Sequence, residues 1–142
     1  MENKLLKIKN LEKNYHNKKG EIKALDNVNF DIGEKEFISI VGPSGCGKST
    51  ILSILSGLEE KSSGTIEFKK NVSIGYMLQD EALFFWRNIL DNCLLGLEVT
   101  GKLNEESKAY VISLLKTYGL GDFMDKFPAS LSGGMRQRVV CI

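Results

Sequence analysis

Residues 42–50 read GPSGCGKST, which fits the pattern G-x-x-x-x-G-K-[ST] at every fixed position. Glycines let backbone N–H groups turn toward phosphate oxygens, and a side chain at Gly45 or Gly47 would obstruct that approach. A helix that begins near Lys48 would add the positive end of its dipole. Lys48 is suited to bridge the β- and γ-phosphates, and the Ser49 hydroxyl to bind Mg²⁺. The stretch therefore predicts a site for a nucleoside triphosphate.

The alternative explanation of this stretch is an ordinary glycine-rich turn. Typical amino-acid usage would give a chance match in roughly one chain of this length in 200. The flanks lower that chance further, because residues 37–41 (FISIV) form the apolar run of a strand covered on both faces. Apolar residues recur at helical spacing after the loop, at Ile51, Ile54, Leu55 and Leu58. We assign phosphate contacts to Gly42, Ser44, Gly45, Cys46, Gly47, Lys48, Ser49 and Thr50.

Length and composition predict one globular domain of ordinary character. The chain has 142 residues, of which 42% are hydrophobic and 26% charged, so a wholly disordered chain is excluded. Lys and Arg total 19 against 18 acidic residues, a balance that argues against a dedicated nucleic-acid binder. No run of 18 apolar residues and no secretory signal are present. Cys46, Cys93 and Cys141 match neither a disulfide framework nor a zinc site, so we expect a soluble intracellular protein.

Periodicity places the remaining elements around the loop. Strands are expected at residues 5–11, 27–32, 65–68 and 72–78, with a polar loop over residues 14–21 and a turn at Gly33-Glu34. One helix is expected where Ile89, Leu90, Cys93, Leu94 and Leu97 form an apolar face. A second is expected from the N-cap Asn104 to Tyr118, with Gly119 as C-cap. Its buried residues should be Val111, Leu114, Leu115 and Tyr118.

A second motif, LSGGMRQR at residues 131–138, precedes another expected helix. Ser132, Gly133 and Gly134 offer a hydroxyl, free amides and a helix N-terminus, which together can receive an anion. Taken alone, this motif would favour an ordinary serine–glycine N-cap turn.

Together the two motifs resemble those of the ATP-binding domains of ABC transporters. GPSGCGKST looks like the Walker A motif of that family, and LSGGMRQR like its signature motif. The resemblance implies an α/β fold with a P-loop NTPase (RecA-like) core, an antiparallel β subdomain and a helical subdomain, truncated at the C-terminus. Residues 1–86 would form the core and β subdomain, and residues 87–142 the helical subdomain.

The same resemblance implies further contacts to ATP and Mg²⁺. Gln79 matches the Q-loop glutamine, which touches Mg²⁺ and senses the transmembrane subunits. Tyr15 matches the aromatic residue that stacks on adenine, although a lone tyrosine near a turn is more often simply packed or exposed. Because two such domains pair head to tail, Ser132, Gly133 and Gly134 would contact the γ-phosphate held by a partner chain.

Residues 83–98 look like the Q-loop region of nitrate, sulfonate and taurine importers, with Phe85 in place of a proline. The implied function is the ATP-binding subunit of an importer, cytoplasmic and peripheral on the inner face of the membrane. Implied partners are transmembrane permease subunits, a second ATP-binding subunit and, indirectly, a solute-binding protein, with no nucleic acid. The cluster of Phe84, Phe85 and Trp86 is either ordinary packing or a coupling surface for a permease helix.

ATP hydrolysis in this family also needs an apolar strand ending in Asp-Glu, followed by a histidine. The sequence has neither after the signature motif, and His16 lies in the expected polar loop. An alternative is therefore a truncated, non-hydrolysing nucleotide-binding remnant, and we expect no Lys48-dependent ATPase activity from these 142 residues. A third possibility, a soluble ABC-class protein of translation or DNA repair, predicts a second cassette or a coiled-coil insertion, and the sequence shows neither.

Overall fold

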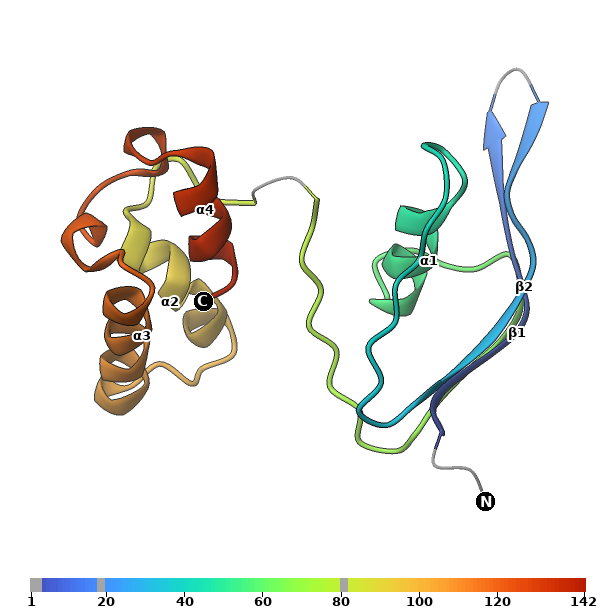
Figure 1. The fold of residues 1–142 in the computed structure, drawn as a ribbon, viewed down its shortest axis with the longest axis horizontal. Helices are drawn as coiled ribbons and strands as arrows, with labels where there is room; N and C mark the ends of the chain where they lie inside the picture. The colour runs from blue at the N-terminus through green and yellow to red at the C-terminus, as the bar shows by residue number, and fades with distance from the viewer. Residues whose placement is uncertain (1–3, 18–19, 80–81) are drawn as a thin grey trace. The chain divides into compact units, whose positions relative to one another are not determined.

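The computed structural model describes residues 4–17, 20–79 and 82–142. The chain divides into two compact units, Met1–Tyr76 and Met77–Ile142 (Figure 1). Each unit has its own hydrophobic core. The phosphate loop belongs to the first unit, and the second motif to the second unit. Each unit is therefore described by itself.

The first unit is built on a three-stranded antiparallel sheet. Strands β1 (Lys4–Asn17) and β2 (Gly20–Gly33) pair along their length, and β3 (Ser63–Phe68) pairs with the other edge of β1. The expected strands at residues 5–11, 27–32 and 65–68 are confirmed within these elements.

The polar loop expected over residues 14–21 is wrong over its described parts. Strand β1 continues to Asn17, which pairs with Gly20 at the start of β2, and His16 pairs with Glu21. Cross-strand pairing outweighs the low strand preference of these polar residues, because strand formation depends on context more than on intrinsic propensity. Residues 18–19 of the expected loop lie outside the described residues.

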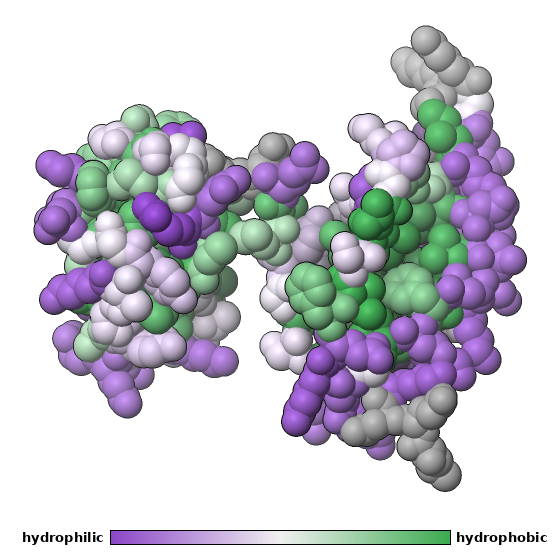
Figure 2. Space-filling view, in the orientation of Figure 1, coloured by the Kyte–Doolittle hydropathy of each residue, from purple (hydrophilic) through white to green (hydrophobic). Residues whose placement is uncertain are grey.

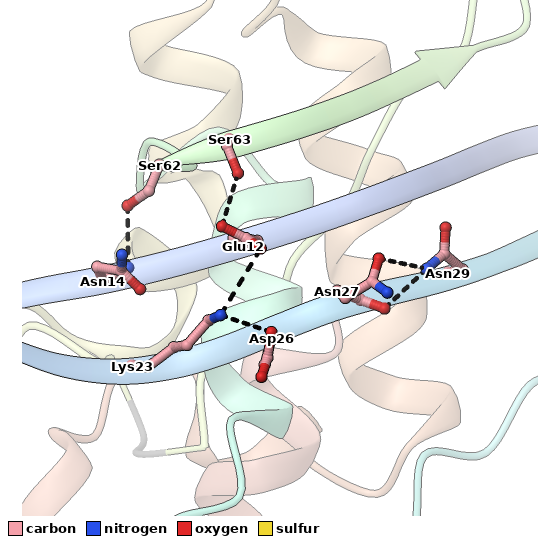
Figure 3. A network of polar contacts seen from close by, with 8 residues as sticks. All are labelled: Glu12, Asn14, Lys23, Asp26, Asn27, Asn29, Ser62 and Ser63. Atoms are coloured by element: carbon pink, nitrogen blue, oxygen red, sulfur yellow. Dashed lines mark hydrogen bonds and ion pairs between the residues drawn. The ribbon is translucent and has the colours of Figure 1, made fainter.

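Polar side chains link the three strands on one side of the sheet (Figure 3). Ser63 of β3 donates to Glu12 of β1 at 3.0 Å, and Glu12 in turn lies 3.7 Å from Lys23 of β2. Lys23 also pairs with Asp26 at 2.6 Å, and hydrogen bonding to that carboxylate raises the pKa of Lys23. Such exposed pairs contribute little stability each, and they lie beside the irregular pairing of β1 and β2.

Helix α1 (Lys48–Leu55) packs against the sheet to close the core of the first unit. Its buried residues Ile51 and Ile54 are two of those expected from the helical spacing. They join Leu6, Ile8, Leu11 and Leu25 in the core, with Val28, Phe30 and Ile32 packed at its margin. The alternation of apolar and polar residues in the sequence of β2 therefore marks the face of the sheet that packs against α1.

Two strands expected from the sequence are not formed. Residues 37–41 and 72–78 run as coil, and Phe37 and Val41 are 95% and 89% exposed rather than buried. Figure 2 shows hydrophobic side chains remaining at the surface of the first unit. A parallel strand exists only through hydrogen bonds to its neighbours, and among the described residues neither segment has a partner strand. The strands expected at residues 37–41 and 72–78 are therefore wrong.

The second unit is helical. It contains helices α2 (Ile89–Val99), α3 (Glu105–Thr117) and α4 (Gly133–Val140), and two short 3-10 turns, at Gly121–Phe123 and Pro128–Ser130, lie between α3 and α4. Its core consists of Ile89, Leu94, Val111, Leu115, Leu120, Leu131 and Val139. Among the described residues, no helix is both long enough and apolar enough to span a bilayer.

The ends of α3 confirm the expected caps, but two of the four residues expected to be buried are not, because Leu114 is only half-buried and Tyr118 is exposed. Asn104 accepts from Ser107 N at 2.8 Å, and the Ser107 hydroxyl accepts from Asn104 N at 2.9 Å. Gly119 has a φ of +72°, as a C-cap glycine requires. Tyr118, expected to be buried, is 52% exposed because the helix ends at Thr117 and the chain turns. Leu120 takes the buried position instead, and its N–H donates to Leu115 O at 2.7 Å.

Candidate nucleotide-binding site

The phosphate loop enters α1 through two glycines with left-handed backbones. Gly45 has a φ of +79° and Gly47, the N-cap of α1, a φ of +90°. Side-chain-bearing residues adopt such angles at a cost, so the loop geometry itself explains these two glycines. The first turn of α1 carries no acidic residue, and no side chain caps it. The positive end of the helix dipole is therefore not compensated by the loop.

The loop presents a row of backbone donors. Among the described residues, no acceptor lies opposite the N–H groups of residues 45–50, and the first helical bond runs from Ile51 N to Gly47 O at 3.0 Å. The first N–H groups of any α-helix lack acceptors within the helix. Here the N–H groups without acceptors also include those of the glycine loop before α1. Donors grouped in this way can cradle an anion with several oxygens.

The Lys48 side chain curls back into the loop. Its ammonium donates to Gly42 O at 2.8 Å and to Pro43 O at 2.6 Å, and lies 3.5 Å from Cys46 Sγ. A positive charge therefore lies against carbonyls of the same loop, where it can bind a phosphate as a point charge.

Gly47 is also required by packing. A Cβ at this position would lie 2.6 Å from Ala24 O and 2.6 Å from Leu25 Cδ2, both on β2. From the sequence, glycine is expected at position 47 because a side chain would obstruct the approach of a phosphate. The structure adds a second reason, which is the close contact with the sheet. Gly45 differs, because nothing lies within 4 Å of its Cβ position.

Tyr15 of β1 lies beside the first turn of α1. Glu59 and Thr50 lie near its hydroxyl, and hydrogen bonding to the Glu59 carboxylate raises the pKa of Tyr15. The N–H of Thr50 is one of the loop donors that no acceptor meets among the described residues. The structure brings Tyr15, Thr50 and the phosphate loop together in one unit, with Tyr15 38% exposed.

The remaining predicted site residues lie in the second unit. Ser132 accepts from Met135 N at 3.4 Å, which is the serine N-cap expected when this motif is considered alone. Gly133 and Gly134 form the first residues of α4. Exposed Gln79 and Gly134 line one cavity of about 320 Å³. Ser49 and Gln79, the two predicted Mg²⁺ contacts, belong to different units, and their joint role stays a prediction.

Two residues near the site were missed by the sequence argument. Lys13 lies with its ammonium 4.9 Å from the centre of the Tyr15 ring, and Glu59 lies 3.2 Å from that ammonium. The only sequence signal for Lys13 was its spacing. It precedes Tyr15 by two residues, which places both side chains on the same face of the strand. Glu59 follows the end of α1 with no pattern that marks it.

The three cysteines predict a labelling experiment that reports on the loop. Cys46 and Cys141 are exposed, whereas burial raises the pKa of Cys93 to about 11. Because the thiolate is the reactive form, we expect iodoacetamide to modify Cys93 at pH 8 far more slowly than the other two. MgATP should slow the labelling of Cys46 and leave Cys141 unchanged as the internal control. Equal protection of both thiols, or of neither, would contradict a nucleotide site at the loop.

Comparison with known proteins matches the whole region that carries both motifs. The family model for ABC transporters matches residues 25–142. The ABC transporter ATP-binding protein YtlC of Bacillus subtilis is 45% identical over 139 residues, which cover 94% of this chain and 54% of YtlC. The taurine import ATP-binding protein TauB of Rhizobium johnstonii is 40% identical over 124 residues, covering 83% of this chain and 47% of TauB. The chain thus spans about half the length of the curated relatives it matches.

A solved structure agrees with the sequence relatives. It is the dimeric post-hydrolysis state of the ATP-binding cassette MJ0796 bound to ADP and Pi, which superposes with a TM-score of 0.81 at 33% identity. The match covers 95% of this chain and 66% of that one. The fold class is therefore that of the P-loop NTPase cassettes, even though two expected strands are unpaired here. With a loop geometry suited to phosphate, two matching motifs and a family model over most of its length, the chain belongs to the ABC transporter family.

Proposed function

We propose that this chain is the ATP-binding part of an ABC-type importer and that it binds MgATP at residues 42–50. The observation that carries the proposal is the row of unsatisfied N–H groups over residues 45–50, with the Lys48 ammonium held inside the same loop. A triphosphate supplies the oxygens and negative charge that this arrangement lacks. TauB, named for taurine import, supports the importer class.

The residues of the loop fit MgATP in a specific way. The N–H groups of residues 45–50 would bind the β- and γ-phosphates, and Lys48 would exchange its loop carbonyls for phosphate oxygens. Among the described residues, no cluster of three or more His, Cys, Asp or Glu side chains could hold a metal. Mg²⁺ would therefore bind through the Ser49 hydroxyl, phosphate oxygens and water, with Gln79 as a further contact. Bound Mg²⁺ would neutralise charge on the phosphates.

Tyr15 is the proposed platform for adenine. Its position beside Thr50 supports this role, because the base then lies near the loop that holds the phosphates of the same nucleotide. Ser132, Gly133 and Gly134 are proposed to act on the nucleotide of a second ATP-binding subunit, in a head-to-tail pair. The dimeric state of the MJ0796 cassette supports such pairing.

The wider assignment follows the family. We propose residues 1–86 as core and antiparallel β subdomain, and residues 87–142 as the helical subdomain that carries the signature motif. Partners would be transmembrane permease subunits on the inner face of the membrane and, through them, a solute-binding protein of the nitrate, sulfonate or taurine type. The balanced charge of the chain, +1 at neutral pH, gives no reason to add nucleic acid.

Coupled hydrolysis is proposed for the importer, whereas residues 1–142 by themselves are proposed to bind ATP without hydrolysing it. Hydrolysis needs a base that polarises the attacking water, and the sequence holds no Asp-Glu pair after the signature motif. Calorimetric titration of the chain with ATP, with and without Mg²⁺, tests the binding proposal. We expect saturable binding that chelation of Mg²⁺ weakens. Absence of saturable binding by the folded chain would overturn the proposal.

A further inference from the structure

Four side chains form a cluster at the edge of the proposed base site, all within the first unit. Lys13 and Tyr15 come from β1, Thr50 from α1, and Glu59 from the turn after α1. The Lys13 ammonium donates to Glu60 O at 2.7 Å, pairs with Glu59 at 3.2 Å and lies 4.9 Å from the Tyr15 ring centre. The cluster thus links the sheet, the phosphate helix and the turn that follows it.

We propose that Glu59 and Lys13 are positioning residues that hold the Tyr15 ring and leave one ring face open to a purine base. This inference rests on the proposed function, because it names the residues that position Tyr15 in the same proposed nucleotide site.

The two faces of the Tyr15 ring have different surroundings. The Lys13 ammonium covers one face, where the negative quadrupole of the ring attracts a cation. The Lys13 side chain is only 14% exposed and that of Glu59 25% exposed, so the pair is held rather than mobile in solvent. A ligand can therefore stack only on the face opposite Lys13. Tyr15 remains 38% exposed, which leaves surface for such a contact.

The Tyr15 hydroxyl also has neighbouring side chains. Glu59 and Thr50 both interact with this hydroxyl, and Glu59 has the larger effect, so two partners act on the outer end of the ring. The hydrogen bond from Tyr15 lowers the pKa of Glu59, which keeps this carboxylate ionised at neutral pH as the acceptor. Since Thr50 follows Lys48 by two residues on α1, the ring orientation is tied to the phosphate loop. Base and phosphate contacts would then share one rigid frame.

The test compares a ligand that has a base with one that does not. Wild-type chain and variants are titrated with MgATP and with inorganic tripolyphosphate plus Mg²⁺. Glu59→Ala should weaken MgATP binding about three- to tenfold, the range of a lost aromatic stack, and leave tripolyphosphate binding unchanged. Glu59→Gln should retain most of the MgATP affinity, because its amide oxygen still accepts from the tyrosine hydroxyl. Glu60→Ala is the matched control, since only its backbone carbonyl takes part.

Each other outcome counts against the inference. An equal loss of affinity for both ligands in Glu59→Ala would indicate a structural role in the loop and would overturn the positioning role. No change for either ligand would overturn it as well. If wild-type chain binds tripolyphosphate and ATP equally, the base platform is wrong while the phosphate loop stands. If wild-type chain binds neither, the proposed function fails and this inference fails with it.

Discussion

Lys48→Ala is expected to reduce the affinity for MgATP by about ten- to hundredfold, because it removes a charge-assisted hydrogen bond to phosphate. In the structure the ammonium contacts only the loop, at Gly42 O, Pro43 O and Cys46 Sγ. Its loss therefore removes no contact in the core of the first unit. The fold should survive, and the effect should appear in binding alone. Calorimetric titration, with far-UV circular dichroism to check folding, measures both.

The matched control for this variant is Lys108→Ala. Lys108 is an exposed lysine on α3, in the unit that does not carry the phosphate loop. Its substitution by alanine removes the same charge from the chain as Lys48→Ala does. Its affinity for MgATP should equal that of wild-type chain. If both variants lost affinity to the same extent, general charge rather than the Lys48 position would explain binding, and the site assignment would be wrong.

Gly47→Ala is expected to destabilise the first unit by about 2–5 kcal/mol and to abolish nucleotide binding. One part of the effect is the left-handed backbone, with φ of +90°, which costs a non-glycine residue about 1–2 kcal/mol. The larger part is overlap, because the new Cβ would approach Ala24 O and Leu25 Cδ2 to 2.6 Å. Either α1 moves away from β2 or the loop changes its path, and both displace the phosphate donors.

Two glycine variants separate the causes. Gly45→Ala has the same backbone requirement, with φ of +79°, but meets nothing within 4 Å, so it should lose only about 1–2 kcal/mol. Gly96→Ala lies inside α2 in open space and should be neutral or stabilise by about 0.5–1 kcal/mol. Hydrogen exchange measured during urea unfolding resolves the two units, and Trp86 fluorescence follows the second unit alone. A loss at Gly47→Ala no larger than at Gly45→Ala would contradict the packing argument.

The sequence predicted the helices well because their signals are local. The apolar spacing of α1, the cap at Asn104 and the serine before α4 each act within a few residues. The error at Tyr118 arose where the helix ended one residue earlier than the pattern suggested. Leu120 then became buried through a turn that periodicity does not describe.

The strands were predicted less well because they depend on partners elsewhere in the chain. Residues 37–41 have the apolar composition of a central strand, but composition cannot supply the hydrogen-bonding neighbours that define one. The hairpin shows the opposite error, since polar residues 14–17 extend β1 by pairing with β2. In both cases the deciding interactions are non-local.

The candidate site shows the same division. The phosphate loop is a contiguous motif, so its residues and its helix could be predicted from spacing alone. The support of Tyr15 by Glu59 joins positions far apart in sequence, and no motif relates them. The role of Gly47 in packing likewise needed the position of β2. Contacts between distant segments therefore had to come from the structure.

The most direct test of the account is a two-dimensional ¹H–¹⁵N NMR titration of the chain with MgATP. The account predicts that the largest shifts fall on the amides of residues 45–50, whose N–H groups lack acceptors. The same titration of Lys48→Ala should show these shifts only at much higher ligand concentration. Binding that leaves those amides unshifted, while other residues respond, would contradict the phosphate loop as the nucleotide site.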